Sequence, residues 1–159
     1  MSRIATRVSA ASIFVAAAIA GTPSSALECP NGSGVYRGTT TTTHELRFAG
    51  QDGGFLILSK GKARAVYPFT LTYSNGLART YLVVTGKDAP SSVMMEFGPD
   101  FAPSKEKGSA PFIVTPELTA GFYYWDAFRS RDQNELLPDS AWRLAGCSPD
   151  RPTKGGVRP

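Results

Sequence analysis

His44 is the only histidine in the chain, so any serine triad must pass through it. A general base needs a nucleophile within hydrogen-bond reach. The sequence contains no Gly-x-Ser-x-Gly elbow that would present an activated serine. A single histidine in a strand is more typical of a surface or rim position. We therefore expect no catalytic residue, and a small hydrolase that uses His44 is the alternative from the enzyme class.

Other reactive groups are few or scattered. The carboxylates between the two cysteines are spread from Glu45 to Asp139, and their spacing brings no specific two together as a glycosidase pair. Structural zinc takes four closely spaced ligands, which two cysteines and one histidine do not supply. The glycines around Gly53 lie in a hairpin turn and do not form a phosphate-binding loop between a strand and a helix. We expect no cofactor and no metal.

The densest aromatic segment is Phe122–Phe128, which favours a binding role. As a strand, this segment would place Phe122, Tyr124 and Phe128 on one face, with Tyr123 and Trp125 on the other. One face must be core. The other could be a stacking platform for a sugar or peptide, or a second layer of core beneath a loop. Tyr123 and Trp125 are therefore candidate binding residues.

Two short segments resemble motifs of the periplasmic inhibitors of C-type lysozyme, which are small disulfide-bearing β-barrels. Phe55–Gly61 is similar to their Tyr-x-x-x-Thr-Lys-Gly motif, and Ser33–Tyr36 is similar to Ser-Gly-x-x-Tyr but one residue shorter. The motifs lie early in this chain and late in that family. The resemblance implies a surface that enters the lysozyme cleft, with Lys60 facing the catalytic carboxylates and with these candidate residues: Ser33, Tyr36, Ser59 and Lys60. The alternative is an ordinary hairpin turn whose lysines are solvated.

These candidates need a scaffold, and the hydrophobic pattern predicts antiparallel strands. Asn75-Gly76 favours a two-residue type I′ turn. Pairing outward from it sets Tyr73 opposite Ala78 and Phe69 opposite Leu82, with an aromatic and aliphatic face on one side. Upstream, 39–48 and 55–58 form strands joined by short turns, which makes a four-strand meander. Further strands are expected at 92–97, 111–115, 122–128 and 141–147. The fold class is therefore all-β, a single small antiparallel barrel or sandwich of about eight strands.

The N-terminal segment 1–26 has the form of a cleavable signal peptide. Arg3 and Arg7 precede an apolar run that is too short to span a bilayer, and small residues follow it at the cleavage site. The protein is therefore expected to be exported to the periplasm or the extracellular space, without a transmembrane segment in the mature chain. Cys29 and Cys147 are the only cysteines, and export favours a disulfide between the N- and C-terminal segments of the β domain 27–147.

Charge patterning argues against a nucleic-acid partner. The formal net charge is +4, and removal of Arg3 and Arg7 lowers it to +2. The remaining excess lies in the Pro- and Gly-rich tail 148–159, which is expected to be a disordered basic segment. The domain itself is nearly neutral and lacks a basic stripe with interleaved aromatics.

Taken together, these features favour an exported, non-catalytic binding protein of the bacterial cell envelope. Its partner would be an envelope protein or a small ligand, and the chain is expected to act as a monomer. An inhibitor of a cell-wall hydrolase is the alternative within binding. An interior cavity lined by Tyr67, Phe69, Tyr124 and Trp125 would favour the small ligand, whereas a filled interior would leave only surface binding.

Overall fold

The described part of the chain, residues 27, 29–104, 110–129 and 136–148, contains eight strands and three short helical segments in the computed structural model. A 3-10 turn, η1 (Pro30–Gly32), precedes the first strand, and α1 (Leu118–Tyr124) and α2 (Asp126–Arg129) lie between the last two strands. The strands are β1 (Gly34–Gly38), β2 (Glu45–Phe48), β3 (Gly53–Lys60), β4 (Ala63–Ser74), β5 (Arg79–Val84), β6 (Ser91–Phe97), β7 (Phe112–Val114) and β8 (Ala141–Cys147).

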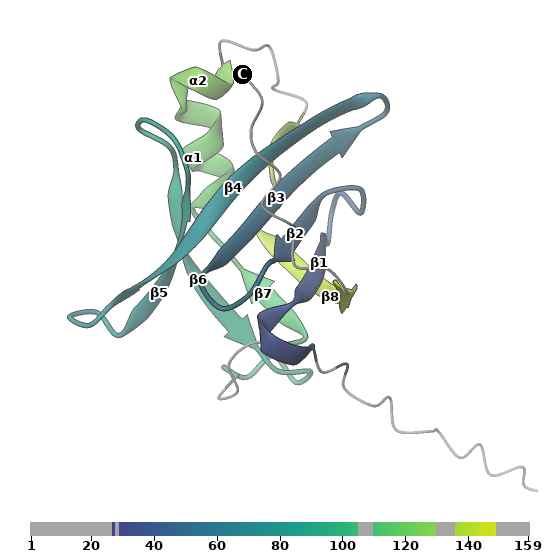
Figure 1. Cartoon of the computed structure of the whole chain (residues 1–159), viewed down its shortest axis with the longest axis vertical. Helices are drawn as coiled ribbons and strands as arrows, with labels where there is room; N and C mark the ends of the chain where they lie inside the picture. Colours follow the sequence, from purple (N-terminus) through teal and green to yellow (C-terminus); the bar gives the residue numbers. More distant parts are fainter. Residues whose placement is uncertain (1–26, 28, 105–109, 130–135, 149–159) are drawn as a thin grey trace, which may run out of the picture.

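The strands form a closed antiparallel barrel in meander order (Figure 1). Each strand pairs with the next along the chain, and β1 pairs with β8 to close the ring. The predicted all-β fold is confirmed, and the barrel is the correct choice over the sandwich. Closure gives each strand two neighbours around the ring, whereas the ends of β3 and β4 that form their hairpin pair only with each other.

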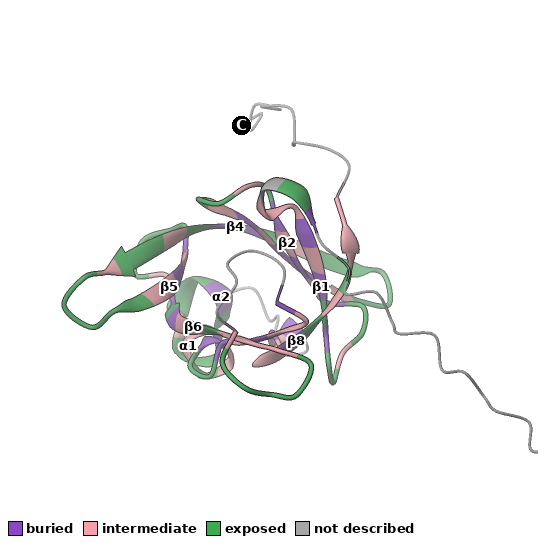
Figure 2. Cartoon of the chain, turned by 90° about the horizontal axis from the view of Figure 1, so that it is seen from below, coloured by how far each residue is buried: buried purple, intermediate pink, exposed green. Residues whose placement is uncertain are grey.

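Alternation along each strand places apolar side chains in the interior. In β3, Leu56 and Leu58 have no exposed surface, and in β4, Tyr67 and Phe69 are almost fully buried. Figure 2 shows the buried positions recurring around the ring. Trp142 of β8 is also fully buried, and its indole Nε1–H donates to Thr115 Oγ1 over 3.0 Å. The interior therefore holds a packed core with its one indole donor satisfied.

The turn between β4 and β5 differs from the predicted one. Tyr73 pairs with Thr80 and Phe69 pairs with Val84, a register two residues away from that of a two-residue Asn-Gly turn. Four residues, 75–78, connect the strands, and Ala78 takes the left-handed conformation with φ of 49°. A shift of two residues leaves every side chain on its predicted face, because side chains alternate with a period of two. The predicted buried face is therefore correct although the pairing is not.

The prediction of a strand over 122–128 is wrong. This segment covers the end of α1 and the first three residues of α2. Leu118 and Phe122 are four residues apart, so they share one helix face, and both have no exposed surface. Tyr124, which a strand would place beside Phe122, is 72% exposed. Packing of a helical apolar face against the barrel therefore outweighs the β preference of the aromatic residues.

The barrel still has eight strands, because β1, which the sequence did not predict, takes the place of the strand expected over 122–128. Of the strand predicted over 39–48, only β2 is a strand. Residues 39–44 form a turn that links β1 to β2, and the His44 N–H donates to Thr41 O within it over 2.9 Å. Gly34 is needed at the start of β1, because a Cβ there would lie 2.7 Å from the Tyr36 ring. Two glycines in a five-residue strand weaken the β signal.

The seam between β1 and β8 is reinforced by the predicted disulfide. Cys29 and Cys147 are bonded, with Cα atoms 5.2 Å apart. The Ser148 N–H donates to Ser33 O over 2.7 Å, so pairing continues one residue into the segment predicted to be a tail. The predicted signal peptide, 1–26, and the rest of the tail, 149–159, lie outside the described residues. No helix within the described ranges is long and apolar enough to cross a membrane.

Candidate functional site

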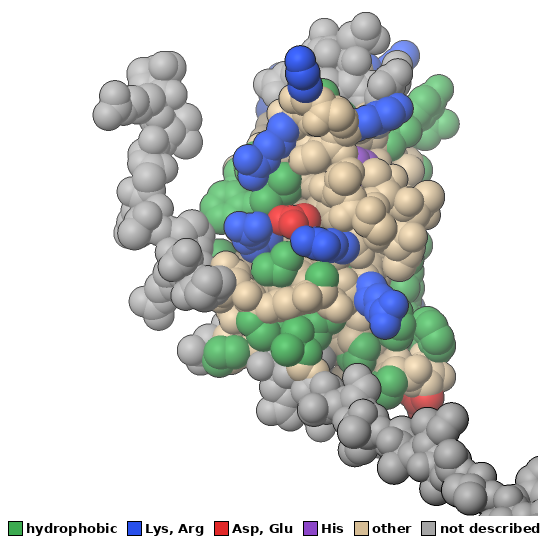
Figure 3. Space-filling view, turned by 90° about the vertical axis from the view of Figure 1, so that its right-hand side faces the viewer, with side chains coloured by type: hydrophobic (Ala, Val, Ile, Leu, Met, Phe, Trp, Pro, Cys, Tyr) green, Lys and Arg blue, Asp and Glu red, His purple; other side chains and the backbone are tan. Residues whose placement is uncertain are grey.

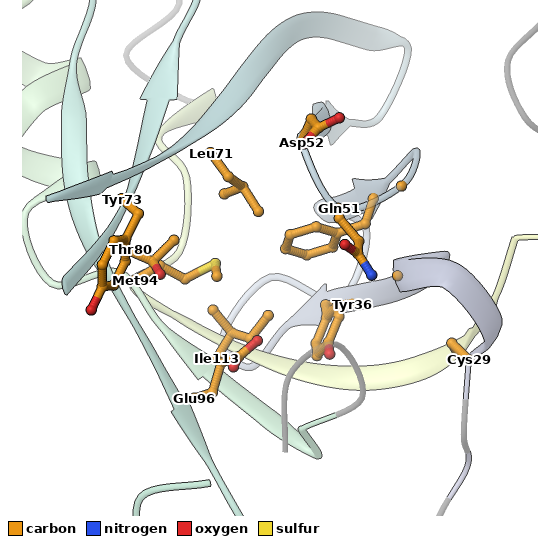
Figure 4. Close-up of a pocket in the computed structure, with 13 residues that line it drawn as sticks. Cys29, Tyr36, Gln51, Asp52, Leu71, Tyr73, Thr80, Met94, Glu96 and Ile113 are labelled. Carbon is orange, nitrogen blue, oxygen red and sulfur yellow. The ribbon is translucent and has the colours of Figure 1, made fainter. Parts of the chain in front are cut away.

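A pocket of about 500 Å³ opens at the end of the barrel where η1, the β2–β3 turn and the lower part of the β4–β5 hairpin lie (Figures 1 and 4). Its residues come from six strands and from the two adjoining loops. They are Cys29, Gly32, Tyr36, Phe48, Gly50, Gln51, Asp52, Leu71, Tyr73, Thr80, Met94, Glu96 and Ile113.

The pocket exists because the two ends of the barrel are filled differently. At the upper end in Figure 1, α1 and α2 lie across the strands, and Phe122 packs edge-on against Tyr67 with ring centroids 5.1 Å apart. Phe128 is also fully buried there. Figure 2, from below, shows these helices on the far side of the ring. At the lower end, the core stops at Tyr36, Phe48 and Ile113, which form the inner lining of the pocket.

Apolar side chains form much of the pocket wall. Leu71 of β4, Met94 of β6 and Ile113 of β7 point towards one another across the space in Figure 4. The Phe48 ring contacts Tyr36 and Phe69 edge-on, with centroid distances of 5.5 and 5.4 Å. These contacts fix the ring against the core, so this part of the wall is preformed.

Tyr36 supplies the most deeply placed polar group. Its side chain is 2% exposed. Burial raises the pKa of the Tyr36 hydroxyl, and the negative charge of Glu96 raises it further. The hydroxyl therefore stays protonated at neutral pH and is a hydrogen-bond donor. Glu96 lies on the same side of the pocket in Figure 4.

The structure does not bring the sequence-predicted binding residues together. Tyr36 lines the pocket, whereas Ser59 and Lys60 end β3 at the opposite end of the barrel (Figure 1). The Ser59 carbonyl accepts from Thr43 Oγ1 over 2.6 Å, and Lys60 is exposed. Ser33 precedes β1 at the pocket end. The common surface that the lysozyme-inhibitor resemblance implies for these four residues is therefore not formed.

Tyr123 and Trp125 also lie away from the pocket, on the helical segment. Tyr123 is half exposed and contacts Tyr124 edge-on at 5.0 Å. Trp125 is partly buried against Tyr67, and its Nε1–H donates to Lys87 O over 3.1 Å. Trp125 therefore has a packing role in this structure, and the exposed aromatic surface of this segment comes from Tyr123 and Tyr124. The interior around Tyr67 and Phe69 is filled, which differs from the cavity considered at these positions.

His44 is 1% exposed, and both ring nitrogens are buried without a hydrogen-bond partner among the described residues. Burial lowers the pKa of this imidazole, and Asp139 raises it to a smaller extent. A general base must reach the proton that it removes. The buried ring does not meet that requirement, so the geometry offers no support for the hydrolase alternative.

Most of the pocket residues were not singled out from the sequence. Leu71 was assigned to the core face, and Met94 and Glu96 were placed only within an expected strand. Inward-facing positions can be inferred from alternation, but which of them lie below the end of the core depends on the strand register around the whole ring. This wall is assembled by residue pairs on neighbouring strands, namely Leu71–Leu82, Thr80–Met94 and Glu96–Ile113.

Comparison with known proteins adds no assignment. No protein-family model matches the chain, and neither a curated protein nor a solved structure matches it significantly. Within the described residues, no group of three or more histidine, cysteine or acidic side chains is arranged to hold a metal ion. The function is therefore inferred from the geometry of the site.

Proposed function

We propose that this chain is an exported, non-catalytic binding protein of the bacterial cell envelope, and that it holds a small ligand in the pocket at the open end of the barrel. The observation that carries the proposal is a pocket of about 500 Å³ at the end of the barrel that the helices leave open, with residues of six strands around it and Tyr36 among them.

The composition of the pocket supports the same function. Ligand sites commonly have volumes of about 300 to 1,000 Å³, with apolar walls and a few placed polar groups. Here, Phe48, Leu71, Met94 and Ile113 supply apolar surface. Thr80 and Gln51 add hydroxyl and amide groups nearer the rim. This combination suits an amphipathic molecule of low molecular mass.

The disulfide supports the exported location. Cys29 and Cys147 join segments 118 residues apart in sequence, and such bonds persist mainly in oxidising compartments. The signal-peptide pattern in 1–26 points to the same compartment. Cys29 is also a pocket residue, so the disulfide holds part of the site in place.

Inhibition of a cell-wall hydrolase is the second candidate. The observation that favours it is the hairpin between β3 and β4, which extends beyond the barrel in Figure 1 and exposes Lys60, Lys62 and Arg64. Cations on a projecting hairpin could enter an acidic cleft. Lysozyme assays with the purified protein and with Lys60→Ala test this candidate. Inhibition by the native protein that Lys60→Ala reduces would support it, and unchanged lysozyme activity would reject it.

The small-ligand proposal is tested by native mass spectrometry. The full-length chain is expressed in a bacterial host and purified from the envelope fraction without denaturation. We expect a retained molecule of low mass that is lost on denaturation. Leu71→Trp should abolish retention because the larger ring fills the pocket, whereas Val66→Trp on the exposed outer face of the same strand should not. Equal retention by both variants, or no retained molecule in the native protein, would contradict the proposal.

A further inference from the structure

Positive charge is concentrated on one outer face of the barrel, away from the pocket. Arg143 of β8, Arg37 of β1 and Arg47 of β2 lie on neighbouring strands and form what is called here the arginine face. Side chains alternate along a strand, so these three point outward while Tyr36 and Trp142 are buried in the core. Figure 3 views the right-hand side of Figure 1 and shows Lys and Arg side chains around an acidic one.

A single carboxylate offsets only part of this charge. Glu45 Oε2 lies 2.9 Å from Arg47 Nη2, and Glu45 Oε1 lies 3.8 Å from Arg37 Nε. Arg143 is exposed and forms no hydrogen bond or ion pair among the described residues. It is directly opposite Arg37 in the β1–β8 ladder, where like charges repel each other. Three arginines against one glutamate therefore leave two positive charges on this face.

The hairpin between β3 and β4 adds cations on the same side of the molecule. Lys62 lies in its turn, Arg64 follows on β4, and both side chains are exposed. In Figure 1, the tip of this hairpin and the turn between β1 and β2 both reach the right-hand side of the barrel. The cations are therefore spread over a broad face and do not converge on one point.

Apolar side chains lie between these cations. Arg47 is opposite Val35 on one side and Phe55 on the other, and both are partly exposed. The Nε atom of Arg47 is buried without a hydrogen-bond partner among the described residues, so the stem of this side chain lies along the sheet and its end reaches solvent. Cations beside apolar surface suit the boundary between anionic headgroups and acyl chains. A hydrophilic polyanion has no apolar group to place there.

From these features we propose that the arginine face docks on an anionic phospholipid surface. Lipid phosphates move laterally, so one can lie beside each guanidinium, which binds phosphate through two parallel N–H donors. A phosphate between Arg37 and Arg143 also offsets their mutual repulsion. No residue of the arginine face lines the pocket, so this contact does not depend on the proposed ligand. Only the presence of a bilayer nearby rests on the proposed location in the cell envelope.

Vesicle co-sedimentation tests the proposal with the protein purified from the envelope fraction. Vesicles of phosphatidylcholine alone are compared with vesicles of equal parts phosphatidylcholine and phosphatidylglycerol. We expect about tenfold stronger binding to the anionic vesicles at low ionic strength. Added salt should weaken this binding, because it screens exposed charges.

Charge-matched variants separate the arginine face from the overall charge. Arg37→Gln combined with Arg143→Gln should weaken binding to anionic vesicles about tenfold. Arg79→Gln combined with Lys87→Gln removes the same charge from exposed positions, at the start of β5 and in the loop after it. These positions lie on the left-hand side of Figure 1, and binding should fall less than about twofold.

A preference for anionic vesicles that the arginine-face variant loses and the control variant keeps supports the proposal. Equal binding to both kinds of vesicle, equal effects of the two double variants, or no binding to either vesicle overturns it. Binding of soluble polyphosphate without binding of the anionic vesicles also overturns it, because the partner is then a soluble anion. In all these cases, native mass spectrometry still decides independently whether the pocket holds a ligand.

Thermal unfolding without vesicles checks that each variant folds. Because Arg37 and Arg143 repel each other, their replacement should leave the melting temperature unchanged or raise it. If that variant does not fold, Lys62→Gln combined with Arg64→Gln takes its place. Loss of the preference for anionic vesicles in this hairpin variant then supports the proposal, and its retention overturns it.

Discussion

Cys29 and Cys147 form a disulfide across the seam that closes the barrel, and Cys29 also lines the pocket. The bond joins the segment before β1 to the end of β8, the two strands most distant in sequence that pair with each other. One covalent link therefore stabilises both the closure of the fold and the wall of the candidate site.

Replacing both cysteines with alanine should destabilise the protein. The bond closes a loop of more than a hundred residues, and its loss should lower the free energy of unfolding by about 2 to 5 kcal/mol, measured by urea denaturation. A reducing agent should lower the stability of the native protein towards that of the variant and leave the variant unchanged. Equal stability of the two proteins under oxidising conditions would contradict this prediction.

His44 should make the protein less stable in acid. Its pKa is lowered by burial, so the unfolded chain binds a proton to His44 before the folded protein does. Stability is therefore unaffected by His44 well above pH 6.5, and falls as the pH drops below that value, by up to about 1.4 kcal/mol per pH unit. His44→Phe should flatten the decrease between pH 7.5 and 5.5 in urea denaturation. Parallel pH profiles for the two proteins would show that His44 is not responsible.

The hydrogen bond from Trp142 to Thr115 should contribute measurably to stability. Both residues are fully buried, and Thr115→Val would leave the indole N–H without this acceptor. The expected loss is about 1 to 3 kcal/mol in the free energy of unfolding. Thr70→Val, on the exposed outer face of β4, is the matched control and should change stability little. A similar effect of the two substitutions would argue against a specific role for the bond.

Ala78 distinguishes the observed turn from the predicted one. Its φ of 49° is unfavourable for a residue with a Cβ, so Ala78→Gly should stabilise the protein by about 0.5 to 1 kcal/mol. Ala63→Gly, at the exposed start of β4, should have the opposite sign because the backbone there is extended. Differential scanning calorimetry can compare both with the native protein. Destabilisation by Ala78→Gly would favour a different turn.

The central strands could be predicted from the sequence because the alternation of apolar and polar residues that specifies each of them lies within the strand itself. In β3 and β4, buried Leu56, Leu58, Tyr67 and Phe69 alternate with less buried neighbours, and the pattern survives an error in turn length. The helical segment could not be predicted in the same way. Its residues favour strands by composition, and the helix is selected by the burial of Leu118 and Phe122 against a barrel assembled from distant parts of the chain.

The candidate site was predictable only in part. Tyr36 was selected because its segment resembles a lysozyme-inhibitor motif. In the structure it lines the pocket for a different reason, because its side chain points inward at the end of the core. Glu96 and Met94 carry no local signal that separates them from other strand residues. Their role depends on the barrel register and on the helices that close the other end.

Methyl NMR of methionine tests the central claim, that the open-end pocket is the ligand site, most directly. Met94 lines the pocket, and Met95 is its neighbour on β6, 38% exposed and not a pocket residue, which makes it an internal control. The full-length protein, labelled at the methionine methyl groups and freed of any retained molecule, is titrated with the low-molecular-mass fraction of an envelope extract, with Met95→Leu used for assignment. We predict that the Met94 methyl resonance shifts and the Met95 resonance does not. A shift at Met95 alone, or no shift at Met94, would contradict the claim.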